Sequence, residues 1–155
     1  MTQATDTSVV RTALVRASVD RCFKVFTEDM ASWWDADHHL VEGFERMEVE
    51  PRAGGAITEY GKDGQSCTWA HVLAYEPPGR FVFSWDISVQ WTIETDPARC
   101  SQVEVLFAPE GDATRVTLTH RHLDRHGDGW EQMAAAVGSP DGWDLTAYAE
   151  VAEAS

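Results

Sequence analysis

The chain has 155 residues, of which 43% are hydrophobic and 25% are charged, a composition typical of one globular domain that buries a core without disulfides. It carries 26 Asp and Glu residues against 12 Lys and Arg residues, and this net charge of −14 repels nucleic-acid phosphates and anionic lipid surfaces. No apolar run approaches the ~20 residues that a membrane-spanning helix needs. We therefore expect neither nucleic-acid nor membrane binding.

The beginning of the chain and its cysteines indicate a cytoplasmic protein. Residues 1–8 are polar, lack the basic and apolar regions of a secretion signal, and are expected to be flexible. Cys22, Cys67 and Cys100 are odd in number and far apart, which indicates neither a disulfide framework nor a Cys-x-x-Cys metal site. We expect a reducing, cytoplasmic location and one domain over residues 9–152, because no repeat or linker divides the chain.

The first elements expected along the chain are a strand and a helix. Residues 9–16 predict the strand. Ser18 is placed as the N-cap of an amphipathic helix, because apolar residues recur at helical spacing from residue 19 to residue 33. Residues 35–40 are polar and predict a loop or a short second helix.

From about residue 42 the apolar period changes to two, which predicts strands. Tight turns separate these strands, among them Asp63-Gly64, the run 77–79 and Gly111. Short strands joined by tight turns indicate an antiparallel meander. The predicted strands cover residues 42–50, 54–61, 66–76, 80–90, 101–108 and 114–122.

The end of the chain returns to helical spacing. Residues 130–137 predict a short helix stopped by Gly138, and Ser139-Pro140 predicts the start of a last helix with an apolar stripe. Both the sheet and this helix have an apolar surface, so the helix must cover the concave face of the sheet. We therefore predict an α+β fold, in which a curved antiparallel sheet of about seven strands wraps a long C-terminal helix and one or two short helices follow the first strand.

Strand alternation divides the sheet into a polar face and an apolar face rich in rings. The polar face includes Ala70, Ser84 and Asp86. Rings at strand period form a packed core more often than a ligand-binding wall, but a curved sheet over a single helix favours a cavity lined by large rings. The predicted apolar face contains Trp69, His71, Leu73, Tyr75, Phe81, Phe83, Trp85, Ile87, Val103, Val105, Phe107, Val116, Leu118 and His120.

Several runs of this sequence resemble the SRPBCC superfamily, and within it the family named after the activator of the heat-shock protein 90 ATPase. The most specific run is Trp69-Ala70-His71-Val72, followed by Glu76-Pro77-Pro78-Gly79 and Phe83-Ser84-Trp85. Residues 19–34 and 101–120 and the closing Gly142-Trp143 also match, so that the resemblance covers residues 9–152. It implies the helix-grip fold of START domains and birch-pollen-type allergens, in which a seven-stranded sheet grips the C-terminal helix over a hydrophobic cavity.

The resemblance also implies a function. Members bind lipids, sterols, polyketides and other apolar molecules, and some catalyse cyclisations or hydrolyses. The co-chaperone that names the family has an additional N-terminal domain, for which 155 residues leave no room, so activation of the chaperone is not expected. We expect a small apolar ligand, no cofactor, and a monomer or homodimer. The expected ligand-binding residues are Phe26, Trp33, Trp34, Trp69, His71, Phe83, Trp85, Phe107, His120 and Trp143.

A catalytic interpretation would use His71 or His120 as general base in an apolar pocket, with Tyr60 or Tyr75 as hydrogen-bond donor. Burial would lower the imidazole pKa and keep the base neutral at pH 7. A nucleophile is not evident, because Ser84 is predicted on the polar face and Cys67 has no basic neighbour in the sequence. Three hypotheses therefore stay open: a binding module, an enzyme acting on the bound molecule, and a co-chaperone-like interaction module whose core is filled by its own side chains.

A metal site has little support in the sequence. His120 and His122 lie two apart on a predicted strand and would point the same way, as a metal-binding pair can. The remaining candidates His38, His39 and His126 lie in predicted loops, and no spacing fixes a third ligand. We therefore expect no metal.

Overall fold

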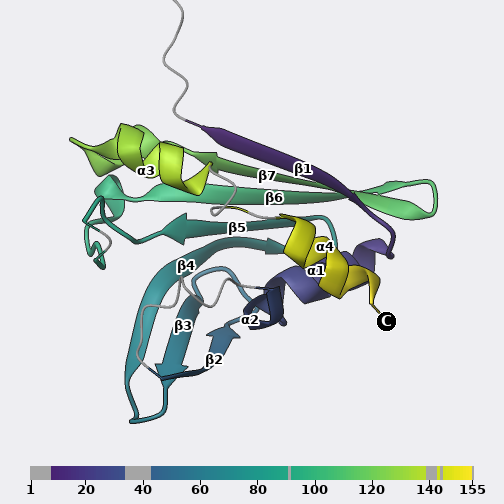
Figure 1. The fold of residues 1–155 in the computed structure, drawn as a ribbon, viewed down its shortest axis with the longest axis horizontal. Coiled ribbons are helices and arrows are strands. Elements are labelled where there is room, and N and C mark those ends of the chain that lie inside the picture. Colours follow the sequence, from purple (N-terminus) through teal and green to yellow (C-terminus); the bar gives the residue numbers. More distant parts are fainter. Residues whose placement is uncertain (1–7, 34–42, 91, 139–142, 144, 155) are drawn as a thin grey trace, which may run out of the picture.

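The computed structural model describes residues 8–33, 43–90, 92–138, 143 and 145–154. The predictions for residues 1–7, Trp34, the segment 35–40 with its two histidines, and Ser139-Pro140 lie outside these residues. Seven strands form one antiparallel sheet in the order β1-β7-β6-β5-β4-β3-β2, so that β1 and β2 are its two edges (Figure 1). The sequential order from β2 to β7 confirms the predicted meander.

The strands lie close to their predicted ranges, except that β5 ends five residues early because the chain leaves the sheet there. The strands are β1 (Val9–Val15), β2 (Phe44–Val49), β3 (Ala56–Gly61), β4 (Ser66–Glu76), β5 (Arg80–Trp85), β6 (Ser101–Glu110) and β7 (Ala113–Arg121). The helices are α1 (Val19–Thr27), α2 (Met30–Trp33), α3 (Trp130–Val137) and α4 (Leu145–Glu153), with the 3-10 helices η2 (Pro97–Arg99) and η3 (Leu123–His126).

The helix predicted over residues 19–33 is divided into α1 and α2. Ser18 caps α1 as expected, since its hydroxyl accepts a hydrogen bond from the backbone N–H of Arg21 at 3.2 Å. The backbone N–H of Glu28 closes the last turn of α1 on Lys24, and α2 begins two residues later. The apolar stripe continues across this break, which is why the sequence pattern did not reveal it.

Helix α4 packs against β1, α1 and α2, and lies beside α1 in Figure 1. The Tyr148 hydroxyl donates a hydrogen bond of 2.6 Å to the backbone carbonyl of Cys22 in α1. The guanidinium of Arg21 donates to three backbone carbonyl oxygens at the C-terminal end of α4, where a positive charge is favoured by the helix dipole. The sheet therefore grips a C-terminal helix of nine described residues, and the predicted helix-grip fold is confirmed.

The sheet bends at strand β4, because this strand carries two bulges. Thr58 and Ile57 of β3 pair with Thr68 and Ala70, so that Trp69 has no partner across this ladder. A bulge of this kind increases the local twist and bends the strand. In Figure 1 strand β4 curves away from the plane of β1, β7, β6 and β5, and takes β3 and β2 with it.

The second bulge lies between Val72 and Ala74, which pair with Phe83 and Val82 of β5 and leave Leu73 unopposed. Each bulge shifts the alternation by one residue, so the stretch between them presents the opposite side chains to the interior.

These bulges overturn three face assignments made from strict alternation. His71 was predicted on the inner face but its side chain is 56% exposed, and Leu73 is likewise exposed at 44%. Ala70, predicted on the polar face, is fully buried, and so is Val72. Trp69 stays buried as predicted, and Tyr75, beyond the second bulge, is partly buried against the core.

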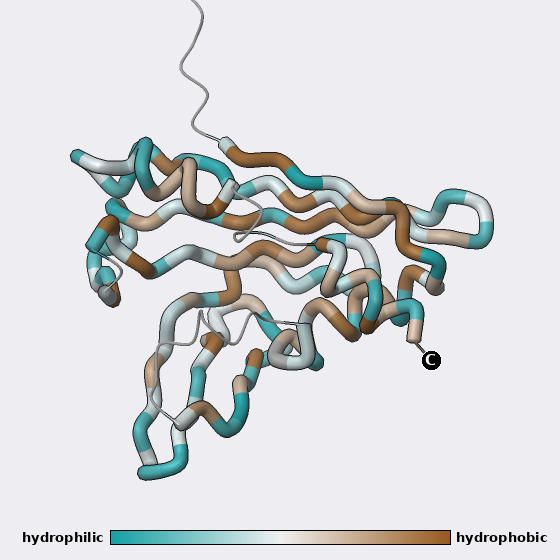
Figure 2. Tube along the Cα trace, in the orientation of Figure 1, coloured by the Kyte–Doolittle hydropathy of each residue, from teal (hydrophilic) through white to brown (hydrophobic). Residues whose placement is uncertain are grey.

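The other strands keep their alternation, with apolar and polar residues succeeding one another along β1, β6 and β7 (Figure 2). Their inward side chains, together with α1, α4 and Trp143, form one contiguous hydrophobic core. In the described part of the chain no helix is long and apolar enough to cross a membrane.

Candidate functional site

The aromatic side chains of the core form two groups of rings that meet where Phe81 and Phe83 approach to 5.3 Å between centroids. The helix cluster lies under α1 and α4 and consists of Phe23, Phe26, Trp33, Tyr75, Phe81, Phe107 and Tyr148. The histidine cluster consists of Trp69, Phe83, Trp85, His120 and Trp143.

The helix cluster is closely packed. Phe26 makes ring contacts with Trp33, Phe81, Phe107 and Tyr148, at centroid distances between 4.8 and 6.2 Å. Most of these contacts are edge-to-face, the favourable arrangement for aromatic pairs. The polar atoms at its rim are satisfied by backbone carbonyls, since the indole N–H of Trp33 donates to Val25 at 3.1 Å. We therefore assign this cluster to fold stability.

The histidine cluster differs because it mixes rings with imidazole and indole nitrogens. Trp85 lies at its centre, with ring-centroid distances of 5.8 Å to Trp69, 5.5 Å to Trp143 and 5.1 Å to His120. Strand pairing places these rings, since Trp85 lies opposite Ser101 across the β5–β6 ladder and Val103 of β6 lies opposite His120 of β7. Side chains directly opposite each other share one face of the sheet.

A buried chain of hydrogen bonds runs through the histidine cluster. The indole Nε1 of Trp143 donates to Nδ1 of His120 at 3.1 Å. Nε2 of His120 lies 2.7 Å from Oγ of Ser101, which in turn lies 2.7 Å from Nε2 of His126. Ser101 and His120 are fully buried and His126 is nearly so, which makes this chain the most extended buried polar feature among the described residues.

Two groups that can only donate, the indole of Trp143 and the backbone N–H of Ser101, determine which atom donates in each of these hydrogen bonds. An indole nitrogen can only donate, so Nδ1 of His120 is an acceptor and the proton of the neutral ring is on Nε2, which donates to Ser101. The backbone N–H of Ser101 also points at Nε2 of His126, at 3.3 Å, so this nitrogen is an acceptor too. The hydroxyl of Ser101 therefore donates to His126, whose proton is on Nδ1.

Both imidazoles are neutral at pH 7. Burial lowers the pKa of His120 to about 3, with a further contribution from the neighbouring His126. Burial also lowers the pKa of His126, against the opposing effect of Glu94 and Asp86. The arrangement of donors and acceptors derived above therefore holds across the physiological range.

Nε1 of Trp85 and Nδ1 of His126 have no hydrogen-bond partner among the described residues. Buried N–H groups are nearly always paired, and leaving one unpaired costs about 1–3 kcal/mol. Both atoms lie out of contact with solvent, so bulk water does not satisfy them. In the described part of the core, both atoms are therefore open donor or acceptor positions.

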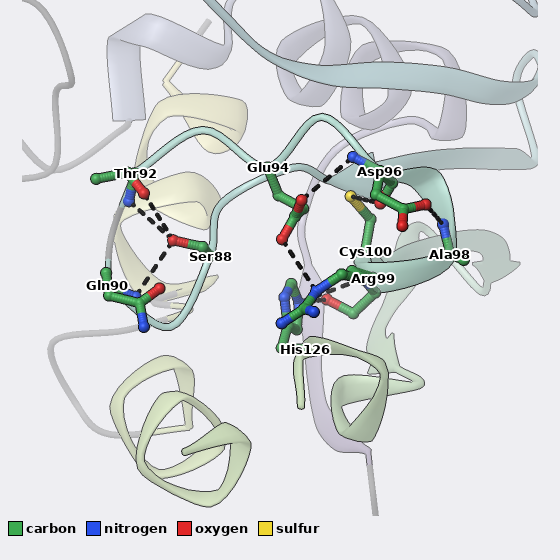
Figure 3. Close-up of polar contacts among 10 residues, drawn as sticks. Ser88, Gln90, Thr92, Glu94, Asp96, Ala98, Arg99, Cys100 and His126 are labelled. Atoms are coloured by element: carbon green, nitrogen blue, oxygen red, sulfur yellow. Dashed lines mark hydrogen bonds and ion pairs between the residues drawn. The ribbon is translucent and has the colours of Figure 1, made fainter. Parts of the chain in front are cut away.

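The segment between β5 and β6 lies against His126 (Figure 3). It begins with a turn in which the Ser88 hydroxyl bonds to Thr92 at 2.8 Å, and it returns to the sheet through η2, capped by Asp96. Glu94 lies between, and its carboxylate is 3.4 Å from the guanidinium of Arg99 on the side of His126 (Figure 3). This ion pair places both a carboxylate, which raises the pKa of His126, and a guanidinium, which lowers it, near the imidazole.

The cysteines do not supply a nucleophile. Burial raises the pKa of Cys100 to about 12, helped by the nearby carboxylate of Asp86. Burial also raises the pKa of the Cys22 and Cys67 thiols. All three groups are therefore protonated at neutral pH, and a thiol is a poor nucleophile and metal ligand.

The structure brings together five of the ten predicted ligand-binding residues in the histidine cluster: Trp69, Phe83, Trp85, His120 and Trp143. It places three others, Phe26, Trp33 and Phe107, in the helix cluster. Trp34 lies outside the described residues. His71 is separate from both clusters, because the bulges of β4 turn it outward.

His71 is part of a polar arrangement on the outer side of the sheet. Its Nδ1 lies 2.7 Å from Oδ2 of the buried Asp86, and its backbone N–H donates to Oγ of Ser84 at 2.9 Å. The prediction that His71 lies in the aromatic interior is therefore wrong. His71 anchors β4 to the end of β5.

His120 is also unsuited to the predicted role of general base, because both of its ring nitrogens are engaged and its Nε2 carries the proton. The predicted phenol donors lie elsewhere. Tyr75 packs against Phe23 in the helix cluster, and Tyr60 lies beneath the guanidinium of Arg46 at 4.0 Å.

His122 does not form a pair with His120. Strand β7 ends at Arg121, and His122 has a left-handed backbone with φ 63°, so the alternation that would align the two imidazoles stops before it. Among the described residues no group of three or more His, Cys, Asp and Glu side chains is placed to hold a metal ion.

Sequence reasoning missed Ser101 and His126. Ser101 was detectable, since it lies two residues before Val103 and four before Val105 and therefore shares their inward face. His126 was assigned to a loop, and nothing in its local sequence shows that η3 folds back against the beginning of β6.

Comparisons with known proteins agree with this geometry. The family model described as Activator of Hsp90 ATPase homolog 1-like protein matches residues 16–149. None of the curated proteins matches the chain. A structure of an anthrahydroquino-gamma-pyrone synthase, Txn09, complexed with SUM, is 38% identical, covering 93% of this chain and 96% of that chain with a TM-score of 0.67.

More distant structures share the fold. Protein NE0264 from Nitrosomonas europaea is 13% identical, covers 99% of this chain and 98% of its own, and has a TM-score of 0.67. DynU16, a putative protein in the dynemicin biosynthetic locus, is 21% identical over 96% of this chain and 48% of its own, with a TM-score of 0.62. The family model spans most of the sequence, and the observed fold accords with it. The chain belongs to the family of Activator of Hsp90 ATPase homolog 1-like proteins, within the SRPBCC superfamily.

Proposed function

We propose that this protein binds a small, flat aromatic molecule against the histidine cluster. The observation that carries the proposal is the 38% identity, over nearly the full length of both chains, to a protein described as an anthrahydroquino-gamma-pyrone synthase. A fused-ring compound of that kind is matched in chemistry by a wall made of Trp69, Phe83, Trp85 and Trp143. Aromatic pairs gain stability beyond the area they bury.

Charge favours a neutral ligand. The protein carries a net charge of −14, and no Lys or Arg is among its described buried residues. A carboxylate or phosphate would therefore enter the core without a cationic partner, at a large desolvation cost. The buried imidazoles of His120 and His126 are neutral, so they offer hydrogen bonds but no charge.

The test is ligand-observed NMR of the purified chain with three probes, namely anthracene, 9,10-anthraquinone and palmitate. We expect the tricyclic probes to bind and palmitate to bind weakly, because the wall is made of rings and the fatty-acid carboxylate has no buried cation to meet it. If no probe binds, the histidine cluster is a core filled by its own side chains. That result would contradict the binding function and favour the interaction-module hypothesis.

A matched pair of variants locates the binding. Phe83 and Phe107 are both buried on the inner face of the sheet, the first in the histidine cluster and the second in the helix cluster. Phe83→Leu should weaken binding of the tricyclic probes about tenfold, and Phe107→Leu should leave it within about twofold. Equal losses in the two variants would show that binding is not specific to the histidine cluster.

A second candidate function is catalysis of a ring closure. It is favoured because the 38% identical protein is a synthase. The group suited to proton transfer is the pair of Ser101 and His126, where the hydroxyl donates to a neutral imidazole nitrogen at 2.7 Å. The test is turnover of the substrate of that synthase, followed by chromatography. Product from the wild type and none from Ser101→Ala would support catalysis, and no product from the wild type would leave binding alone.

A further inference from the structure

The open donors of the core belong to one connected set of side chains. Trp85 lies directly opposite Ser101 across the β5–β6 ladder, and its ring is 5.1 Å from that of His120. Ser101 connects His120 to His126 through two hydrogen bonds of 2.7 Å. Nε1 of Trp85 and Nδ1 of His126 are therefore two unpaired polar atoms linked through His120 and Ser101, the first by a ring contact and the second by hydrogen bonds.

Both open atoms are donors. An indole nitrogen has no acceptor capacity. Nδ1 of His126 carries the ring proton, because Nε2 of the same ring accepts from the backbone N–H and the hydroxyl of Ser101. A molecule that binds beside them and pairs these atoms must therefore supply acceptors, and a hydrocarbon would leave both unpaired.

We propose that the ligand of this protein carries a carbonyl or other neutral oxygen acceptor, which receives hydrogen bonds from Nε1 of Trp85 and Nδ1 of His126. This inference rests on the proposed binding function and narrows its ligand to oxygenated ring systems such as quinones and pyrones. A neutral oxygen fits better than a carboxylate, because the described buried residues include no Lys or Arg.

The buried hydrogen bonds orient the donor of His126, and the indole of Trp85 packs against His120 at 5.1 Å between ring centroids. The ring of His126 is oriented by two bonds from Ser101, and Ser101 is held by His120, which Trp143 fixes in turn. Both donor atoms are shielded from solvent, so an arriving oxygen reaches them only when side chains of the network move apart. Association that requires such a movement is slower than the ordinary range for docking.

The experiment compares two probes with the same tricyclic skeleton, 9,10-anthraquinone with two carbonyl groups and anthracene with none, by fluorescence titration of the full chain. We expect the wild type to prefer the quinone by at least tenfold. Trp85→Phe keeps a ring and removes the indole donor. His126→Met keeps a weak thioether acceptor for Ser101 and has no N–H donor. Each variant should reduce the preference for the quinone about three- to tenfold and leave anthracene binding unchanged.

Trp130→Phe is the matched control, because Trp130 of α3 lies outside the histidine cluster and the substitution removes the same number of indoles. It should leave the preference unchanged. If Trp85→Phe does not fold, as judged by circular dichroism, His126→Met remains as the test of the inference. Equal affinity of the wild type for both probes, or a preference unaffected by either variant, would overturn the inference while leaving the proposed function standing. Binding of neither probe would overturn both.

Discussion

The indole of Trp143 donates a hydrogen bond to Nδ1 of His120 at 3.1 Å, and this bond connects a residue two positions before α4 to strand β7. It also fixes which nitrogen of His120 carries the proton, and through that nitrogen the orientation of Ser101 and His126. A contact between two distant parts of the chain therefore sets the polarity of the buried network.

Trp143→Phe should destabilise the protein by about 1–3 kcal/mol, because it retains most of the ring but leaves Nδ1 of His120 buried without a donor. Urea unfolding followed by circular dichroism measures the change. Trp130→Phe is the control and should cost less than about 1 kcal/mol, since Trp130 is only partly buried. Equal losses in both variants would mean that the bond to His120 contributes nothing.

The tautomers of the two buried histidines are a direct consequence of the bond directions. We expect the proton of His120 on Nε2 and that of His126 on Nδ1, because an indole and a backbone N–H occupy the other nitrogens. Long-range nitrogen–proton NMR of the imidazole rings distinguishes the two tautomers. The same tautomer in both rings would contradict the donor and acceptor assignment of the buried hydrogen bonds.

Stability should fall as the solution is acidified below pH 6.5. The folded-state pKa of His120 is lowered to about 3 and that of His126 is also lowered, so both rings bind protons more readily when unfolded. Their contribution to stability is complete above the unfolded pKa of about 6.5 and is lost as the pH falls towards the folded values. Each ring accounts for a slope of up to about 1.4 kcal/mol per pH unit.

The variant that isolates this effect is His126→Gln, which removes one titrating ring while keeping an acceptor for Ser101. Its free energy of unfolding should depend less steeply on pH between 6.5 and 4.5 than that of the wild type, as measured by urea titration at several pH values. Parallel curves would show that His126 is not buried in its neutral form.

Phe26→Ala should cost about 3–5 kcal/mol, because Phe26 is fully buried and makes four ring contacts in the helix cluster. Leu106→Ala, on the exposed side of β6, should cost less than about 1 kcal/mol. Thermal and urea unfolding check both values. A small cost for Phe26→Ala would show that this cluster is loosely packed.

The sequence was sufficient to predict most of the fold, because the relevant signals are local. The change of apolar period from helix to strand spacing, the glycine turns and the cap at Ser18 each depend on a few neighbouring residues. The face of β4 was not predictable in this way. Its two bulges arise where Trp69 and Leu73 are left without partners on β3 and β5, and alternation within the strand does not reveal which residues stay unpaired.

The candidate site was predictable only in part, for a similar reason. The rings at Phe83, Trp85 and His120 follow from strand alternation. The buried hydrogen bonds depend on His126 of η3 and on Trp143, which reach the sheet through tertiary contacts. His126 has an ordinary local sequence, and its role appears only when its ring is seen beside Ser101.

The central claim is that a flat, oxygenated aromatic ligand binds at the histidine cluster, and the indole N–H signals of the seven tryptophans test it most directly. In a proton–nitrogen correlation spectrum of the labelled protein titrated with 9,10-anthraquinone, the signal of Trp85 should shift downfield as its N–H gains an acceptor. The signal of Trp143 should move with it, and that of Trp130 should stay in place. No change in any indole signal, or a change confined to Trp130, would contradict the account.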